Sequence, residues 1–230
     1  MTDVGATKAE KVYEPKDPAG LSRLLVILLW IDLVVGLFNG VATFAELQLV
    51  SAMPGDTPTS FSEGPPLPVA VTLIRSFVSL TALASYVVTG FVCLKWIYRM
   101  SLNAHALTKG LTITPGWAIG WYFVPIASLF KPFQALKEAW QASAQPTAWR
   151  SVDTPGILRL WWGLWLASGI LSNISFRVSM SAKTTDMLVL SDGLDLVIAI
   201  VGVPLNLVFI RIVEQMKTFQ ASTLSQRVFS

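Results

Sequence analysis

Charged and amide side chains inside apolar stretches are the residues of this chain whose types and spacing could do chemistry. Ionisable groups within a bilayer are costly, so they usually mark an ion or solute pathway or a pair that holds helices together. The candidate intramembrane polar site comprises Asp32, Asn39, Glu46, Arg75, Asp192, Asp195 and Asn206. Two interpretations stay open for it, a structural staple and a transport pathway.

Most charges of this site are expected at one level of the membrane. Glu46, Asp192 and Asp195 fall near the outer ends of apolar runs, and so does Arg75. An unpaired buried charge costs far more than a paired one. Arg75 is therefore predicted to pair with one of the three acids.

Asp32 differs, because it lies about 15 Å from the inner end of its run at 1.5 Å per residue. It lies far from any obvious arginine partner. We expect this carboxyl group to be neutral or to accept a hydrogen bond from Tyr86, Thr89 or Asn206.

Four long apolar runs carry these residues, over approximately 21–50, 69–98, 157–176 and 188–212. A helix needs about 20 mostly apolar residues to cross a bilayer core. The chain is 53% hydrophobic and only 13% charged, whereas soluble domains carry about 25% charged residues. The sequence predicts an all-α polytopic membrane protein with four transmembrane helices in one domain, residues 21–217.

Basic residues predict the orientation of these spans. They lie in residues 1–23 and along the long connection 99–159, whereas the connection 51–68 has none. The sequence thus predicts a multi-pass protein of the plasma (inner) membrane. The positive-inside rule places both of its termini in the cytoplasm and residues 53–68 and 179–187 outside. Residues 1–20 are expected to be a disordered tail and residues 218–230 a second cytoplasmic tail. The net charge of +3 reflects topology, and nucleic acid is not an expected partner.

One apolar segment, residues 116–130, is too short for a clear assignment. It has about 15 residues and contains Pro125, so it is expected to be interfacial or re-entrant. A fifth span is the alternative, and it would move the C-terminal charges outside.

The surrounding segment, residues 115–143, is a second candidate site. Its aromatic side chains favour the headgroup level of a membrane, and Arg99 and Asn103 share a helix face just before it. The candidate interfacial docking residues are Arg99, Asn103, Trp117, Trp121, Pro125, Lys131, Pro132 and Trp140. They could dock a lipid headgroup or a partner, or could serve only anchoring and folding.

The same segment carries a family resemblance. Its motifs are Trp96-Ile97-Tyr98-Arg99, Asn103, the run from Pro115 to Pro125, Leu129-Phe130-Lys131-Pro132, Trp140, Ser143 and Trp161-Trp162. The chain resembles, over roughly residues 75–217, the bacterial membrane family called domain of unknown function 4328. Mild departures occur at Ser128 and Phe130. The resemblance implies a four-helix membrane protein and supplies no activity.

Sequence motifs of catalysis are missing from this chain. It has no Gly-rich phosphate loop, no HExxH and no GxSxG, and His105 and Cys93 are its only histidine and cysteine. We therefore expect no catalytic residues, no cofactor and no metal. The leading hypothesis is a non-enzymatic membrane module that interacts with proteins or lipids. The alternative is a small transporter or channel, formed as a homo-oligomer through Gly36 and Gly40.

Overall fold

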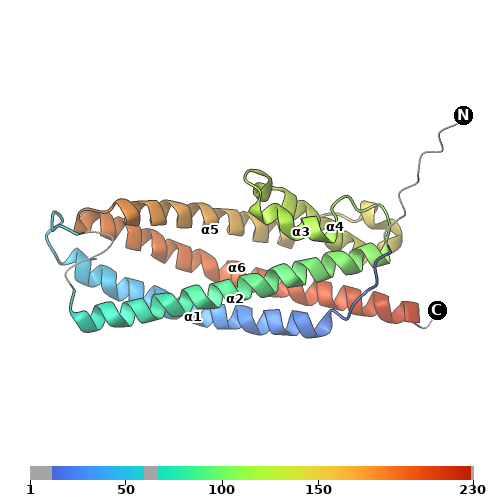
Figure 1. Ribbon diagram of the computed structural model, residues 1–230, viewed down its shortest axis with the longest axis horizontal. Coiled ribbons are helices and arrows are strands. Elements are labelled where there is room, and N and C mark those ends of the chain that lie inside the picture. The colour runs from blue at the N-terminus through green and yellow to red at the C-terminus, as the bar shows by residue number, and fades with distance from the viewer. Residues whose placement is uncertain (1–11, 60–66, 229–230) are drawn as a thin grey trace, which may run out of the picture. The chain divides into compact units, whose positions relative to one another are not determined.

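The computed structural model of this chain describes residues 12–59 and 67–228, with side chains up to residue 224. Four long helices and two short ones follow one another in the order α1 (Ala19–Ser51), α2 (Val69–Leu107), α3 (Pro115–Gly120), α4 (Lys131–Ala144), α5 (Gly156–Ser181) and α6 (Thr185–Val228) (Figure 1). Three 3-10 turns, η1 (Trp121–Phe123), η2 (Ala127–Leu129) and η3 (Pro146–Ser151), flank α4. The predicted all-α class is confirmed for the described residues, which contain no strand.

Three helices, α1, α2 and α6, are long and apolar enough to cross a membrane. Helix α5 has 26 residues but does not reach the same hydropathy. Its tryptophans at 161, 162 and 165 and its serines lower the average, because an indole carries a polar N–H and a hydroxyl is polar. The membrane character of the chain therefore rests on α1, α2 and α6.

Two of the long helices extend well beyond their apolar runs. Helix α2 continues to Leu107 and α6 to Val228, although the runs end at about 98 and 212. Hydropathy marks only the part of a helix that faces lipid, whereas the backbone hydrogen bonds of a helix continue as long as the chain permits. The expected tail from residue 218 is thus helical up to Val228.

Contacts divide the chain into two compact units. Unit 1 comprises residues 1–18, 97–153 and 218–230, and unit 2 comprises residues 19–96 and 154–217. Helices α2 and α6 each contribute one part to both units without a break.

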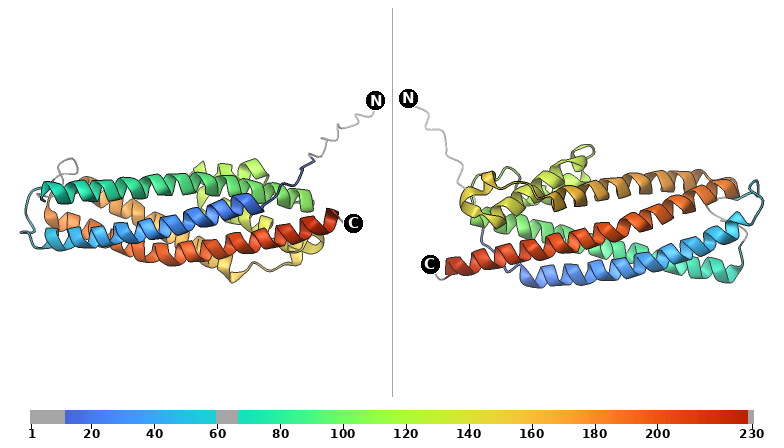
Figure 2. Two further views of the ribbon diagram at one scale, coloured as in Figure 1. Left: turned by 90° about the horizontal axis from the view of Figure 1, so that it is seen from below. Right: turned by 180° about the vertical axis from the view of Figure 1, so that it is seen from behind.

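The helices of unit 2 run side by side along their length (Figure 2). Their large apolar side chains point outward, among them Phe38, Phe77 and Ile200, each more than two-thirds exposed. Small or hydroxyl side chains such as Thr43 and Ser175 are buried instead. This arrangement suits a bundle whose surroundings are lipid, because lipid does not drive large apolar side chains inward.

The two connections at one end of unit 2 bind each other through their backbones. Thr59 N–H donates to the carbonyl of Lys183 at 3.1 Å, and Thr185 N–H donates to Thr57 at 3.2 Å. Pro58 and Thr184 form an isolated β-bridge. Each connection already joins two helices, and these bonds hold the α1–α2 pair to the α5–α6 pair at this end of unit 2.

Unit 1 has an ordinary apolar core around the amphipathic helix α4. Leu136 and Trp140 of α4 are buried, and Trp140 packs edge-on against Phe219 of α6 with 5.4 Å between ring centroids. The carboxylate of Glu138, also on the buried face, accepts hydrogen bonds from Thr112 and Ile113. The loop before α3 is thereby fixed to α4.

Candidate functional site

Arg75 is the centre of the polar contacts of unit 2. Its Nε lies 2.5 Å from Glu46 Oε2, and its Nη1 donates to Asn39 Oδ1 at 2.8 Å and to Ser79 Oγ at 2.7 Å. The side chains of the ion pair are only 20% and 17% exposed. The predicted pairing of Arg75 is confirmed, with Glu46 as its partner. Two hydrogen bonds from this guanidinium connect α2 to two turns of α1, and the third, to Ser79, lies within α2.

The acids of α6 use other partners. Asp195 Oδ1 accepts a hydrogen bond of 2.6 Å from Ser175 Oγ of α5, beside a contact of 3.3 Å between Ser175 and Ser191. Asp192 lies within electrostatic reach of Arg75, Glu46 and Asp195. The structure thus brings the predicted outer charges into one region but divides their direct bonds between two helix pairs.

Asp32 binds a residue that sequence reasoning did not identify. Its Oδ1 accepts a hydrogen bond from the hydroxyl of Ser85 on α2. The three expected partners were wrong. Tyr86 is 70% exposed and Asn206 donates to the carbonyl of Gly202 in its own helix. Thr89 Oγ1 is buried and has no hydrogen-bond partner within the described part of the chain.

A constant register explains why Ser85 and not Thr89 reaches Asp32. Helices α1 and α2 run antiparallel, and Trp96 Nε1 donates to Ser22 Oγ at 3.0 Å toward their other end. The Asp32–Ser85 and Ser22–Trp96 pairs follow nearly the same pairing offset, which places Thr89 one turn away from Asp32. Thr89 therefore lies opposite the apolar turn of α1 that contains Leu29. The direct bonds of Asp32, Glu46 and Asp195 therefore run between neighbouring helices.

The second candidate site is divided by burial. Trp117 and Pro125 are exposed, and Lys131 binds Gln134 Oε1 at 3.2 Å. Trp117 stacks on Trp121 with 4.5 Å between ring centroids. In contrast, three of the residues predicted for docking are buried: Asn103, Pro132 and Trp140. The amphipathic helix α4 and the last turns of α2 turn those side chains into the core of unit 1, so a docking surface on the folded unit does not include them.

Asn103 instead organises a buried hydrogen-bond network. Its Nδ2 donates to Gln220 Oε1 and to the carbonyl of Lys16, both at 2.8 Å, while its Oδ1 accepts from Lys16 N–H at 2.8 Å. Gln220 Nε2 donates to Ser143 Oγ at 2.9 Å and to the Met100 carbonyl at 3.0 Å. The amide of Asn103 therefore pairs with the backbone of the N-terminal segment on both edges.

Arg99 adds to the same attachment, since its Nη1 donates to the carbonyl of Asp17 at 2.9 Å. Residues 1–11 of the tail that was expected to be disordered lie outside the described residues. At Lys16 and Asp17, however, the chain has defined partners on α2. We call this attached N-terminal segment, residues 12–18, the strap. Sequence reasoning missed it because a polar, charged segment carries no apolar periodicity.

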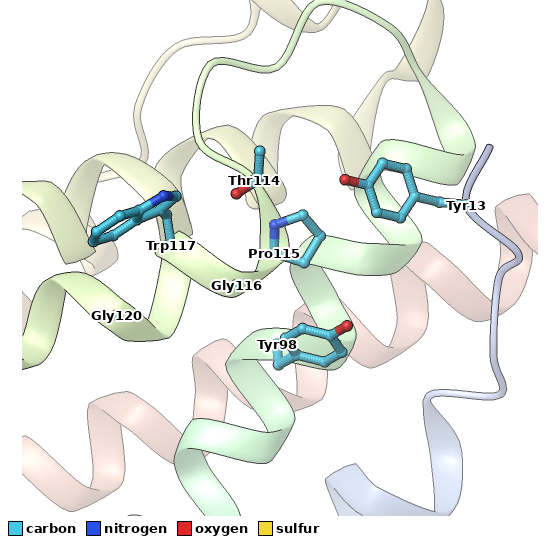
Figure 3. Close-up of a pocket in the computed structure, with 7 residues that line it drawn as sticks. All are labelled: Tyr13, Tyr98, Thr114, Pro115, Gly116, Trp117 and Gly120. Carbon is cyan, nitrogen blue, oxygen red and sulfur yellow. The ribbon is translucent and has the colours of Figure 1, made fainter. Parts of the chain in front are cut away.

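A pocket of about 570 Å³ lies where the strap meets α2 and α3 (Figure 3). Three aromatic side chains from three separate segments line it: Tyr13 from the strap, Tyr98 from α2 and Trp117 from α3. Thr114, Pro115, Gly116 and Gly120 complete the lining. Tyr13 also contacts the ring of His105, with 5.1 Å between centroids. The lining is aromatic and uncharged, so it suits an apolar or extended ligand.

Metal chemistry has no evident centre in the described residues. No group of three or more histidine, cysteine, aspartate or glutamate side chains there is arranged to hold an ion. Cys93, the one cysteine of the chain, is free.

Comparison with known proteins locates the chain in one family. No curated protein and no solved structure matches it. The family model described as a domain of unknown function, DUF4328, matches residues 69–218, which include all of α2 to α5 and most of α6. The resemblance seen in the tryptophan- and proline-rich segment is thereby confirmed, and this chain is a member of the DUF4328 family.

Proposed function

We propose that this chain is a non-enzymatic module of the inner membrane, with four spans and with both termini in the cytoplasm. Unit 2 anchors the chain, and unit 1 binds an extended segment of a partner protein in its aromatic pocket. The observation that carries the proposal is the one uncharged pocket that Tyr13, Tyr98 and Trp117 line.

Length and charge support α5 as the fourth span. Its 26 residues extend about 39 Å at 1.5 Å per residue, and a bilayer core is about 30 Å thick. Its charged side chains, Arg159 and Arg177, lie toward its two ends. Long basic side chains near helix ends reach the headgroup level, so their cost is small.

The binding role is supported by how firmly the pocket is built. The buried amide network of Asn103 and Gln220 fixes the strap, and the strap provides Tyr13. Preorganised side chains lose little conformational entropy on binding. Grooves lined by aromatic side chains are a recurrent way to bind extended peptide segments, which need few hydrogen bonds of their own.

The polar contacts of unit 2 favour the staple interpretation over the transport pathway. Arg75, Asp195 and Asp32 each bind a group on a neighbouring helix. Groups that satisfy one another hold helices together, whereas a pathway needs groups that can exchange partners with the transported species.

Site-specific photocrosslinking tests the binding role. A benzoylphenylalanine at Tyr98 should form adducts with a protein in intact cells, and Trp117→Ala should reduce their yield. The matched control is the same probe at Thr147, an exposed residue of unit 1 outside the pocket lining. Equal adducts from both positions, or lipid adducts alone at Tyr98, would contradict a protein-binding pocket.

Cysteine labelling tests the topology separately. In a Cys93→Ser background, cysteines at Thr57 and Lys183 should react with an impermeant reagent from outside, while one at Lys109 should not. External labelling at Thr147 would make the 116–130 segment a span and would overturn the four-span arrangement.

A further inference from the structure

The turns between α3 and α4 expose a dense set of large apolar side chains. Phe123 is 74% exposed, Ile126 76%, Leu129 52% and Phe130 50%. They lie within eight residues of one another in sequence. Several large apolar side chains exposed so close together in the chain favour a site of contact with a protein or a membrane.

The backbone that carries these side chains has an unusual local conformation. Two 3-10 turns, η1 and η2, flank Pro125, and between them Ile126 has φ = 65°. A β-branched residue rarely adopts a positive φ because its side chain is crowded there. Ile126 is nevertheless exposed, so burial of its side chain in unit 1 does not account for that conformation.

The chain itself indicates what covers this surface. Helices α1, α2 and α6 are apolar enough to cross a bilayer, and α2 passes without a break into unit 1 at Ile97. Unit 1 is therefore tethered directly to a membrane helix. Lys131 follows the apolar turns, with its Nζ 5.9 Å from the centroid of the Phe130 ring. Apolar tips beside a basic residue are the combination that binds the interface of a bilayer with anionic lipids.

We propose that Phe123, Ile126, Leu129 and Phe130 insert into the bilayer at the boundary between headgroups and acyl chains, with Lys131 beside the lipid phosphates. The occupant of this surface is thus lipid, whereas the aromatic pocket is offered to a protein segment. The insertion deepens the docking role proposed for unit 1 and rests on its membrane anchorage, but not on occupancy of the pocket.

Nitroxide labels on the reconstituted full-length chain test the insertion. Single cysteines replace Phe123, Ile126 or Leu129 in a Cys93→Ser background, and the protein is placed in liposomes of phosphatidylethanolamine and phosphatidylglycerol. Collision rates with oxygen, which concentrates in lipid, and with a water-soluble nickel chelate are then measured. The matched control is a label at exposed Thr147 in η3.

Labels at the apolar turns should favour oxygen and show a marked loss of nickel accessibility relative to the label at Thr147. Lys131→Glu should restore part of the nickel accessibility in anionic liposomes and have less effect in uncharged ones. Nickel accessibility equal to that of the control would overturn the proposal, and so would exclusion of both reagents, which indicates a protein cover. Failure of crosslinking at Tyr98 would leave these results unchanged, so the two proposals fail separately.

Discussion

Units 1 and 2 solve the problem of buried polar groups in different ways. Unit 1 buries a closed network of neutral amides, in which Asn103 and Gln220 bind each other, Ser143 and backbone carbonyls. Its one buried carboxylate, Glu138, accepts several hydrogen bonds from a single loop. Unit 2 uses a partly exposed ion pair and isolated hydroxyl–carboxylate bonds between helices. A closed buried network must satisfy every one of its polar groups, whereas a single contact between two apolar helices needs only to be better than no partner at all.

The ion pair should give the largest effect on stability. Arg75→Leu leaves Glu46 without its partner and removes the bonds to Asn39 and Ser79. Breaking a buried pair costs about 3–5 kcal/mol, and the partial exposure of this pair places it at about 3 kcal/mol. Unfolding of the detergent-solubilised protein measures this loss.

A double-mutant cycle sharpens that result. Glu46→Leu added to Arg75→Leu should recover part of the loss, while Asp195→Leu should not, because Asp195 binds Ser175. Equal recovery with both acids would show that the outer charges act as one diffuse cluster.

The amide network should give an intermediate effect. Asn103→Ala removes one side of three hydrogen bonds and leaves Gln220 Oε1 unpaired in a buried site. The expected loss is about 2 kcal/mol, and it should detach the strap that carries Tyr13. Proteolysis at the N-terminal segment measures the detachment, alongside the midpoint of unfolding.

Gln215 provides the control for this variant, because it is an exposed amide on α6, the helix that carries Gln220. Gln215→Ala should change stability by less than about 0.5 kcal/mol. If Asn103→Ala left the N-terminal segment as resistant as the unmodified protein, the network would not be what holds the strap.

Thr89 should give the smallest effect, with the opposite sign. Its buried hydroxyl has no hydrogen-bond partner among the described residues, and a buried unsatisfied polar group destabilises a fold. Thr89→Val keeps the shape and removes the hydroxyl, so stability should rise by about 1 kcal/mol. Ser85→Ala, which deletes the bond to Asp32, should instead lower it. A loss of stability with Thr89→Val would mean that the hydroxyl binds a group such as an ordered water.

Local pattern was sufficient to predict much of this molecule. The apolar runs predicted the helices and the polar positions within them, because hydropathy over about 20 residues needs no tertiary information. The pairing of Arg75 also followed from the sequence, since an unpaired charge at that depth is too costly to persist.

Partner choice was less predictable. Asp32 was expected to bind Tyr86, Thr89 or Asn206 but binds Ser85. All four residues have suitable donors, so composition does not discriminate between them. The register between α1 and α2 decides, and register depends on how two whole helices pack.

The docking segment shows the same division. The tryptophan- and proline-rich stretch identified the family from the sequence alone, and its aromatic residues predicted an interfacial role. Which of them are exposed could not be read from the sequence, because Trp117 and Trp140 are the same residue type in one segment. Only the folded structure buries Trp140 against Phe219, leaves Trp117 open beside Tyr13 and Tyr98, and turns Phe123 and Ile126 outward. Residue type determines that an aromatic ring seeks an apolar surface, and the tertiary contacts determine whether that surface belongs to the protein itself or to a partner.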